Sequence, residues 1–190
     1  VIVLNKSHVE FLFSNYRTSR GEFPSQDIEP TEEQLSAVHQ LIISGAVPYA
    51  DFAIFGPFGR RLLRKLTLMA YHYNAPEGTW KRVELPGPPD FESWWKSWLV
   101  LKCTLLLLGS VKPERLDLYG EHIRSFITTY GPTCWFLVYQ ADVRMRSEHF
   151  ERIRRRLQIE FDVQNIQFGF DPLTPWDGVF AAATKDKEFW

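Results

Sequence analysis

Hydrophobic residues recur at helical spacing along most of this 190-residue chain. The first regular segment begins at Thr31, which has Gln34 three residues later in the spacing of a capping box. The carboxylates between them suit the positive end of a helix. One apolar face follows, and Gly45 ends the pattern. The sequence therefore predicts a helix over residues 31–44, with a core face of Leu35, Val38, Leu41 and Ile42.

Two runs of strand-forming residues, Leu66–Tyr73 and Thr79–Leu85, come next. The residues between them, Asn74-Ala75-Pro76-Glu77-Gly78, are turn formers at the place where a hairpin needs them. Prolines from Pro86 onward end the second run, and Asp90 stands in the position of a helix N-cap. We predict one β-hairpin followed directly by a helix.

The segment from Phe91 to Leu108 is the most apolar part of the chain and is nearly long enough to span a membrane. It carries Glu92, Lys96 and Lys102, each of which is costly at bilayer depth. We therefore expect a buried helix at the centre of the core and no contact with a membrane. Its large side chains cover more than one face: Trp94, Trp95, Trp98, Leu101, Leu105 and Leu108.

Two amphipathic segments meet at the break Tyr130-Gly131-Pro132. The first begins near Pro113, which suits a first helical turn. The second carries a stripe of Tyr139, Val143, Phe150, Ile153 and Leu157, and pairs Glu148 with Arg152 and Glu151 with Arg155 at a spacing of four. We predict a long antiparallel helix pair. Residues 161–170 are expected to form a short strand or an extended connector, and Thr174-Pro175-Trp176-Asp177 begins a last helix.

Taken together, these elements predict a mainly α-helical α+β fold with one β-hairpin and a long antiparallel helix pair. The length suits one domain. Residues 1–30 mix apolar and polar positions and are punctuated by Pro24 and Pro30, so we expect an N-terminal arm or linker there. Residues 31–190 are expected to form a single mainly helical domain.

The formal net charge of -1 excludes a globally basic coat for nucleic acid. Any anion binding must therefore come from locally clustered charge. Only two cysteines occur, Cys103 and Cys134, which are too few and too far apart for a disulfide framework or a zinc knuckle. The apolar start Val1–Leu4 lacks the basic leader and the cleavage site of a signal peptide. We expect an intracellular protein, cytoplasmic or nuclear.

Arginines are concentrated after the Gly131-Pro132 break, with only Glu148 and Glu151 between them. A locally positive helix of this kind is able to contact phosphates. The competing interpretation is a solvent-exposed face whose arginines form salt bridges with neighbouring acids. Exposed arginines alone do not indicate whether the partner is RNA, DNA or an acidic protein. The cluster comprises Arg144, Arg146, Arg152, Arg154, Arg155 and Arg156. We predict RNA or single-stranded DNA as a partner, contacted by Arg144, Arg152, Arg154, Arg155 and Arg156.

A second basic cluster consists of Gly59, Arg60, Arg61 and Arg64. Glycine amides followed by arginines suit an anion, so we regard these four residues as a candidate anion site. The spacing fits neither a Walker loop nor a dinucleotide fingerprint, and a plain turn is the competing interpretation.

A hydrolytic enzyme with a cysteine nucleophile would need that thiol beside an imidazole that makes it a thiolate. Nothing in the spacing brings Cys103 or Cys134 to His122 or His149, and the second histidine of a metalloprotease helix is missing because Ile153 stands there. His39 and His72 stand alone. We expect no catalytic residue, no metal and no cofactor.

Several segments of the sequence resemble the corresponding segments of one known family. In the first half these are Pro30–Leu35, Tyr49–Arg61 and Glu84–Pro89, and in the second half Tyr130-Gly131-Pro132, Trp135, Leu137–Arg144 and Thr174-Pro175-Trp176. From Pro30 onward the chain resembles an uncharacterised family that is repeated in many copies in dinoflagellate genomes. Members of that family occur in retroelement-like reading frames, sometimes ahead of a Cys/His knuckle, which implies a Gag-like structural role. This chain has no knuckle, and its first thirty or so residues do not match.

We therefore expect a non-enzymatic structural or assembly module, Gag-like or retroelement-associated, that contacts nucleic acid through its basic helix. Self-association is also expected, because seven tryptophans exceed what one small core normally requires. Two alternatives stay open. One is a protein-interaction domain whose exposed aromatic residues bind an unknown partner, and the other is an enzyme of unknown class with its site near residues Gly56 to Arg64.

Overall fold

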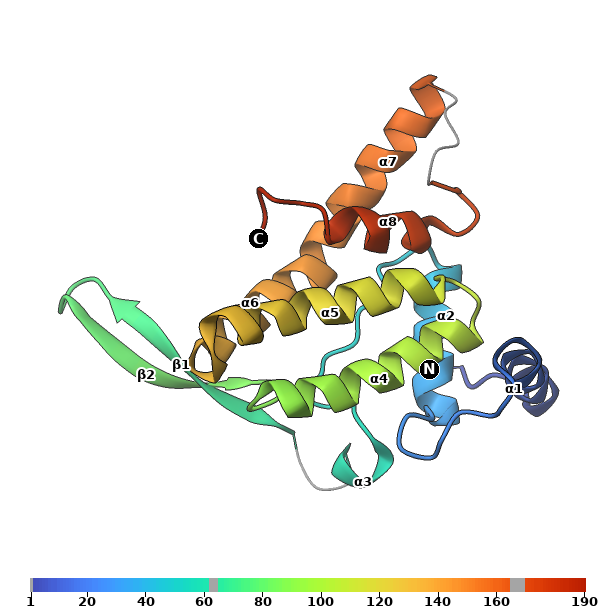
Figure 1. The fold of residues 1–190 in the computed structure, drawn as a ribbon, viewed down its shortest axis with the longest axis horizontal. Helices are drawn as coiled ribbons and strands as arrows, with labels where there is room; N and C mark the ends of the chain where they lie inside the picture. The colour runs from blue at the N-terminus through green and yellow to red at the C-terminus, as the bar shows by residue number, and fades with distance from the viewer. Residues whose placement is uncertain (1, 62–64, 165–169) are drawn as a thin grey trace.

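A body of packed helices and one projecting β-hairpin make up the molecule (Figure 1). The computed structural model describes residues 2–61, 65–164 and 170–190. It confirms the predicted mainly helical α+β class with an antiparallel hairpin. The elements are α1 (Lys6–Arg20), α2 (Glu32–Ile43), α3 (Phe58–Arg61), β1 (Thr67–Asn74), β2 (Thr79–Pro86), α4 (Phe91–Leu107), α5 (Pro113–Tyr130), a 3-10 turn (Pro132–Cys134), α6 (Trp135–Arg144), a π-turn (Met145–His149), α7 (Phe150–Gln164) and α8 (Pro175–Ala183).

Helix α4 lies at the centre of the body. Asp90 caps it as predicted, because its side chain accepts a hydrogen bond from the Ser93 amide at 2.8 Å. Trp94 and Trp98 are buried and stack with their ring centroids 5.5 Å apart. The expectation of a buried central helix is confirmed. Among the described residues, no helix is both long and apolar enough to cross a membrane.

Helix α5 packs tightly against α4 at Gly120. A Cβ atom at this position would lie 2.7 Å from Trp98 Nε1 and 3.1 Å from Trp95 Cζ3. The neighbouring Tyr119 is fully buried, with its ring centroid 5.2 Å from that of Trp98. The missing side chain at Gly120 therefore sets the distance between these two helices.

The hairpin of β1 and β2 joins the body at its base and extends well beyond it (Figure 1). Leu68 and Ala70 are buried at the base. The chain leaves β2 through Gly87, where φ is 150° and a Cβ atom would lie 2.2 Å from Tyr139 Cε1. The predicted hairpin is confirmed, with the turn between Asn74 and Thr79. We call the part of the hairpin that lies beyond Leu68 and Ala70 the arm.

Helix α5 is followed by a reversal, after which α6 runs back beside α5 and α7 packs mainly against α8. The reversal uses Gly131, whose φ is 84°. The second helix is not continuous, because a π-turn separates α6 from α7 and the Phe150 amide donates to the Met145 carbonyl. Helix α7 continues to Gln164, so the expected strand or extended connector is wrong for residues 161–164. Residues 165–169 lie outside the described part.

Helix α8 packs against α5 and α7 and buries Trp176, Val179 and Phe180. Pro175 occupies its first turn as predicted, although the Thr174 side chain makes no capping hydrogen bond. The chain then folds back, and Trp190 Nε1 donates to the Ala183 carbonyl at 2.8 Å. This return packs Trp190 against His122 and Phe126 of α5, and Phe189 against His149 of the π-turn.

The sequence predicted an N-terminal arm or linker, distinct from the hairpin, for residues 1–30. These residues contain the fifteen-residue helix α1. Its N-cap is Asn5, whose side chain accepts from the His8 amide. Helix α2 has the predicted capping box between Thr31 and Gln34. The first helix is attached to the body through a small buried cluster of Val9, Leu12, Tyr16, Leu35, Cys103 and Leu107.

Candidate functional site

Three exposed arginines follow the outer side of α6 and α7. Arg144 ends α6, and Arg152 and Arg156 stand one turn apart in α7. With His149 and residues of the returning C-terminal segment, they line a pocket of about 660 Å³. We call Arg144, Arg152 and Arg156 the arginine stripe. It brings together three of the five residues predicted to contact nucleic acid.

Carboxylates in the same pocket limit the positive charge of the stripe. Asp186 Oδ2 lies 2.7 Å from His149 Nε2, and this hydrogen bond is the main cause of the lowered pKa of Asp186. Glu148 and Glu188 also line the pocket. The predicted pair between Glu148 and Arg152 is absent from the ion pairs of the described residues. The stripe is a partly neutralised cationic surface.

The other two predicted contact residues are bound to an acid of their own helix. Glu151 accepts two hydrogen bonds from Arg154, at 2.6 and 2.9 Å, and one from Arg155 at 3.0 Å. The bond with Arg154 is the largest cause of the lowered pKa of Glu151, and it raises the pKa of Arg154. The predicted pair of Glu151 with Arg155 is confirmed. On this side of α7 the arginines form a salt-bridged surface.

Arg146 does not belong to the surface with which the sequence grouped it. Its side chain is 2% exposed, and the Asp142 carboxylate accepts hydrogen bonds from its Nε at 2.9 Å and its Nη2 at 2.7 Å. Its Nη1 donates to the Ala50 carbonyl at 3.0 Å. The interpretation as a surface arginine is wrong, because a spacing of four residues puts Asp142 and Arg146 on the same, buried side of the helix.

Asp142 is the centre of a buried polar network. Its carboxylate also accepts from Trp94 Nε1 at 2.9 Å and from the Tyr119 hydroxyl at 2.8 Å. Burial by itself would lower the pKa of Arg146, but the neighbouring Asp142 reverses this effect and the pKa is raised. A neutralised and fully hydrogen-bonded pair is typical of a structural joint, here between α4, α5 and α6. The spacing of Asp142 and Arg146 was the available signal in the sequence.

The candidate anion cluster contains the single turn α3. Gly59 lies exposed in this turn, and Arg60 Nη1 donates to the Ser93 carbonyl at 3.4 Å in the first turn of α4. Arg64 and the side chain of Arg61 lie outside the described part. The contact of Arg60 fits the competing interpretation of a turn.

The structure does not bring the thiols and imidazoles together. Burial raises the pKa of Cys103 to about 12, so this thiol is protonated at neutral pH. Cys134 donates instead to the Gly131 carbonyl. The His122 ring lies against Trp190, with centroids 4.7 Å apart, and His149 is bonded to Asp186. Within the described ranges, no group of three or more His, Cys, Asp and Glu residues has an arrangement that would hold a metal ion.

The sequence predicted the hairpin but not the chemistry of its outer face. Side chains alternate between the two sides of a strand, and residues paired across strands point the same way. The register therefore places six residues on one face, which we call the aromatic face: Met69, Tyr71 and Tyr73 of β1, and Trp80, Arg82 and Glu84 of β2. Its four apolar members are 41–69% exposed. The alternation of aromatic and other residues along both strands was the sequence signal from which this face could have been predicted.

Contacts on the aromatic face are few. The rings of Tyr73 and Trp80, which pair across the strands, have centroids 5.3 Å apart. Tyr71 reaches the body, where its ring centroid lies 5.5 Å from that of Phe136 in α6. The far part of the face is therefore open to solvent.

Comparisons with protein families, with curated proteins and with solved structures find no match. Function is therefore inferred from the arginine stripe and the aromatic face. These two surfaces differ in chemistry and lie on different elements.

Proposed function

We propose that this domain is a non-enzymatic assembly module, Gag-like or retroelement-associated, which joins copies of its own chain and contacts RNA or single-stranded DNA. The observation that carries this proposal is the presence of two separate exposed surfaces. The arginine stripe follows α6 and α7, and the aromatic face follows the arm, which projects in another direction (Figure 1). Arginines attract phosphates, and exposed apolar patches are typical of protein contacts.

A binding role is favoured over catalysis by the state of the reactive side chains. Cys103 is buried with a raised pKa, and Cys134 is bonded to a backbone carbonyl. His149, the remaining candidate base at the surface, is bonded to Asp186. Near the alternative enzyme site, Arg60 is bonded to α4. Each of these groups is either buried and protonated or bonded to a structural partner, which supports a module without its own chemistry.

The proposed location is intracellular, either cytoplasmic or nuclear. Cys103 and Cys134 are both free cysteines. Free thiols suit a reducing compartment. Expression of the tagged chain in cells, followed by fractionation, would test the proposal.

The nucleic-acid part is tested by removing the charge of the arginine stripe. In the triple variant Arg144→Ala, Arg152→Ala and Arg156→Ala, the affinity for single-stranded RNA should fall. The slope of log affinity against log salt should also decrease by about 2, because each phosphate contact on a single strand contributes about 0.7. Fluorescence anisotropy across a salt series measures both quantities.

The matched control removes three cations from α1, in the variant Lys6→Ala, Arg17→Ala and Arg20→Ala. It changes the net charge by the same amount on a different surface, so its salt slope should stay near that of the wild type. Equal slopes in the wild type and the stripe variant, with both folded by circular dichroism, would exclude the stripe as the contact surface.

A protein-interaction domain is the second candidate. It is favoured by the carboxylates that accompany the stripe, since Glu148, Asp186 and Glu188 lie in the same pocket as the arginines. A surface of mixed charge suits a protein partner with its own mixed charge better than a polyanion. Absence of RNA binding by the wild type at low salt would select this candidate.

A further inference from the structure

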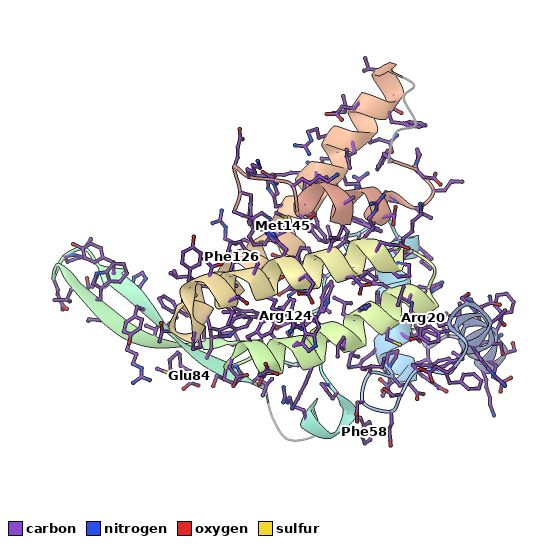
Figure 2. All side chains as sticks on the ribbon, in the orientation of Figure 1. Arg20, Phe58, Glu84, Arg124, Phe126 and Met145 are labelled. Atoms are coloured by element: carbon purple, nitrogen blue, oxygen red, sulfur yellow. The ribbon has the colours of Figure 1, made fainter. Side chains whose placement is uncertain are left out.

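The segment after α8, residues Thr184–Trp190, folds back over the body, and we call it the strap. Trp190 anchors it, because the indole Nε1 donates to the Ala183 carbonyl at 2.8 Å. The ring of Trp190 also packs against Phe126 toward the end of α5, with centroids 5.6 Å apart. Figure 2 shows the strap returning to the part of α5 where Phe126 is labelled. The strap therefore has a defined place on the body.

The strap brings two carboxylates to the arginine stripe. Asp186 and Glu188 line the same pocket as the stripe arginines, and Glu148 of the π-turn adds a third acid. Among the described residues that line this pocket, three arginines are thus matched by three acids, two of which belong to the strap. The strap therefore largely decides the net charge that the pocket presents.

The strap is held by residues of the stripe and by their neighbour His149. Asp186 Oδ2 lies 2.7 Å from His149 Nε2, and Asp186 Oδ1 accepts from the Phe189 amide at 3.1 Å. The hydrogen bond with His149 is the largest cause of the lowered pKa of Asp186, and the charge of Arg156 contributes to it. The Arg144 guanidinium lies 5.7 Å from the centroid of the Phe189 ring. Two of the three stripe arginines thus already interact with the strap.

These contacts lie at the surface of the molecule. No residue of the strap is buried, whereas α8 before it buries Trp176, Val179 and Phe180. Ionic contacts near the surface contribute little to stability, and segments with few buried apolar contacts open locally at low cost. The strap can therefore leave the pocket while the core stays packed.

A phosphate chain that approaches the stripe meets the carboxylates of the strap. Like charges at a contact surface are unfavourable, and the two acids also neutralise the attraction of the arginines. Full contact of phosphates with Arg144 and Arg156 requires that Asp186 and Glu188 move away. The apparent affinity is then reduced by the fraction of molecules in which the strap is closed.

We propose that the strap is an autoinhibitory contact, which occupies the arginine stripe and is displaced when single-stranded nucleic acid binds there. The proposal rests on the nucleic-acid part of the proposed function and adds its regulation. Asp186 and Glu188 supply the charge that competes with phosphate. Trp190 holds these acids in place.

The charge of the strap is tested with the variant Asp186→Asn, Glu188→Gln, which keeps the size of both side chains. It should bind a fluorescein-labelled oligouridylate about tenfold more tightly than the wild type at low salt. The slope of log affinity against log salt should increase by about 1.4, because two arginines each gain a phosphate contact that contributes about 0.7. Fluorescence anisotropy across a salt series measures both quantities.

The matched control neutralises two exposed acids on another surface, in the variant Glu10→Gln, Glu33→Gln of α1 and α2. It changes the net charge by the same amount, so its salt slope should stay near that of the wild type. An equal increase in affinity and slope in both variants would show a general effect of net charge and would overturn the proposal.

The position of the strap is tested without any change in charge. Trp190→Ala removes the anchor, so the variant should also bind oligouridylate more tightly, although by less than the charge variant because the loosened strap remains attached. The matched control is Trp80→Ala on the arm, which removes an exposed indole and should bind as the wild type does. Circular dichroism establishes that both variants are folded.

Displacement itself is measured by hydrogen exchange of the wild-type chain with mass spectrometry. The backbone amides of residues 184–190 should exchange faster when oligouridylate is bound. The triple variant of the arginine stripe should show no such increase, because it lacks the contact that competes with the strap. Exchange that stays the same or slows in the wild type would overturn the proposed displacement.

Two further results separate this proposal from the function on which it rests. If neither the wild type nor the two strap variants bind oligouridylate at low salt, the nucleic-acid function and the autoinhibition are both excluded. If the wild type binds through the stripe and the folded strap variants bind with the same affinity and salt slope, the autoinhibition alone is excluded.

Discussion

The carboxylate of Asp142 holds together parts of the chain that are far apart in the sequence. It accepts a hydrogen bond from Trp94, 48 residues away, and its partner Arg146 reaches the carbonyl of Ala50, 96 residues away. The Arg146 guanidinium also lies 4.1 Å from the centroid of the Phe52 ring. The pair of Asp142 and Arg146 thus joins α4, α5 and α6 to the segment of Ala50 and Phe52, so a change here is expected to destabilise the whole body.

Replacement of Asp142 by Asn should lower the free energy of unfolding by about 3–5 kcal/mol, because it leaves the buried charge of Arg146 uncompensated. The comparison is Glu151→Gln, which weakens a more exposed arrangement and should cost about 1 kcal/mol or less. Urea unfolding followed by tryptophan fluorescence gives both values.

The double variant Asp142→Leu, Arg146→Met supplies a further test of this reasoning. Since it removes both charges, it should be more stable than the single Asp142→Asn variant. If the double variant is the less stable of the two, the main role of the pair lies in its hydrogen bonds rather than in charge compensation.

Among the elements, those with local signals were predictable and those that depend on distant partners were not. Some signals act within a few residues and were correct. The capping box at Thr31 and the cap at Asp90 marked where α2 and α4 begin, and the turn residues before Gly78 marked where β1 ends. The spacing of Asp142 and Arg146 was a local signal of an ion pair, but the burial of Arg146 depends on the distant residues Ala50 and Phe52, whose proximity no local pattern specifies. The π-turn likewise has no local marker, so the sequence suggested one continuous helix.

The contact of α4 with α5 gives a prediction about Gly120. Alanine normally stabilises a helix interior relative to glycine by about 1 kcal/mol. In Gly120→Ala the new Cβ would meet Trp98 Nε1 at 2.7 Å, and the packed core has little room to yield, so the net effect should be a loss of about 1–3 kcal/mol.

Ser125→Ala on the exposed side of α5 is the matched substitution, and it should change the stability by no more than about 0.5 kcal/mol. Thermal or urea unfolding measures the change in stability of the two variants relative to the wild type. A stabilised Gly120→Ala protein would mean that α4 and α5 separate without cost.

For the molecule as a whole, stability should depend on pH through histidines that are partly buried. Burial lowers the pKa of His122, whose ring is covered by Trp190, and it also lowers the pKa of His39. The folded state therefore binds a proton less readily than the unfolded chain, in which a histidine titrates near about 6.5. Between these two pKa values, the unfolded state takes up more protons, and stability decreases as the pH falls.

The denaturant midpoint should accordingly decrease from pH 7 to pH 5, and the decrease should be smaller in His122→Gln. The comparison is His72→Gln on the arm, where the side chain is exposed. Its pH dependence should match that of the wild type. An NMR titration that finds His122 with a pKa at or above its ordinary value would contradict the expected cause.

The π-turn at Met145–His149 has a consequence for how the chain tolerates changes in length. A π-turn holds one residue more than the α-helical path requires. Deleting one exposed residue of this turn, Glu148, would return the segment to regular helix and leave the residues after it facing in about the same direction. Ile153 would stay in the core, and the salt-bridged arginines would stay at the surface. The same deletion within the regular part of α7 would rotate everything after it by about 100° about the helix axis, so we expect it to be tolerated less well than the deletion of Glu148.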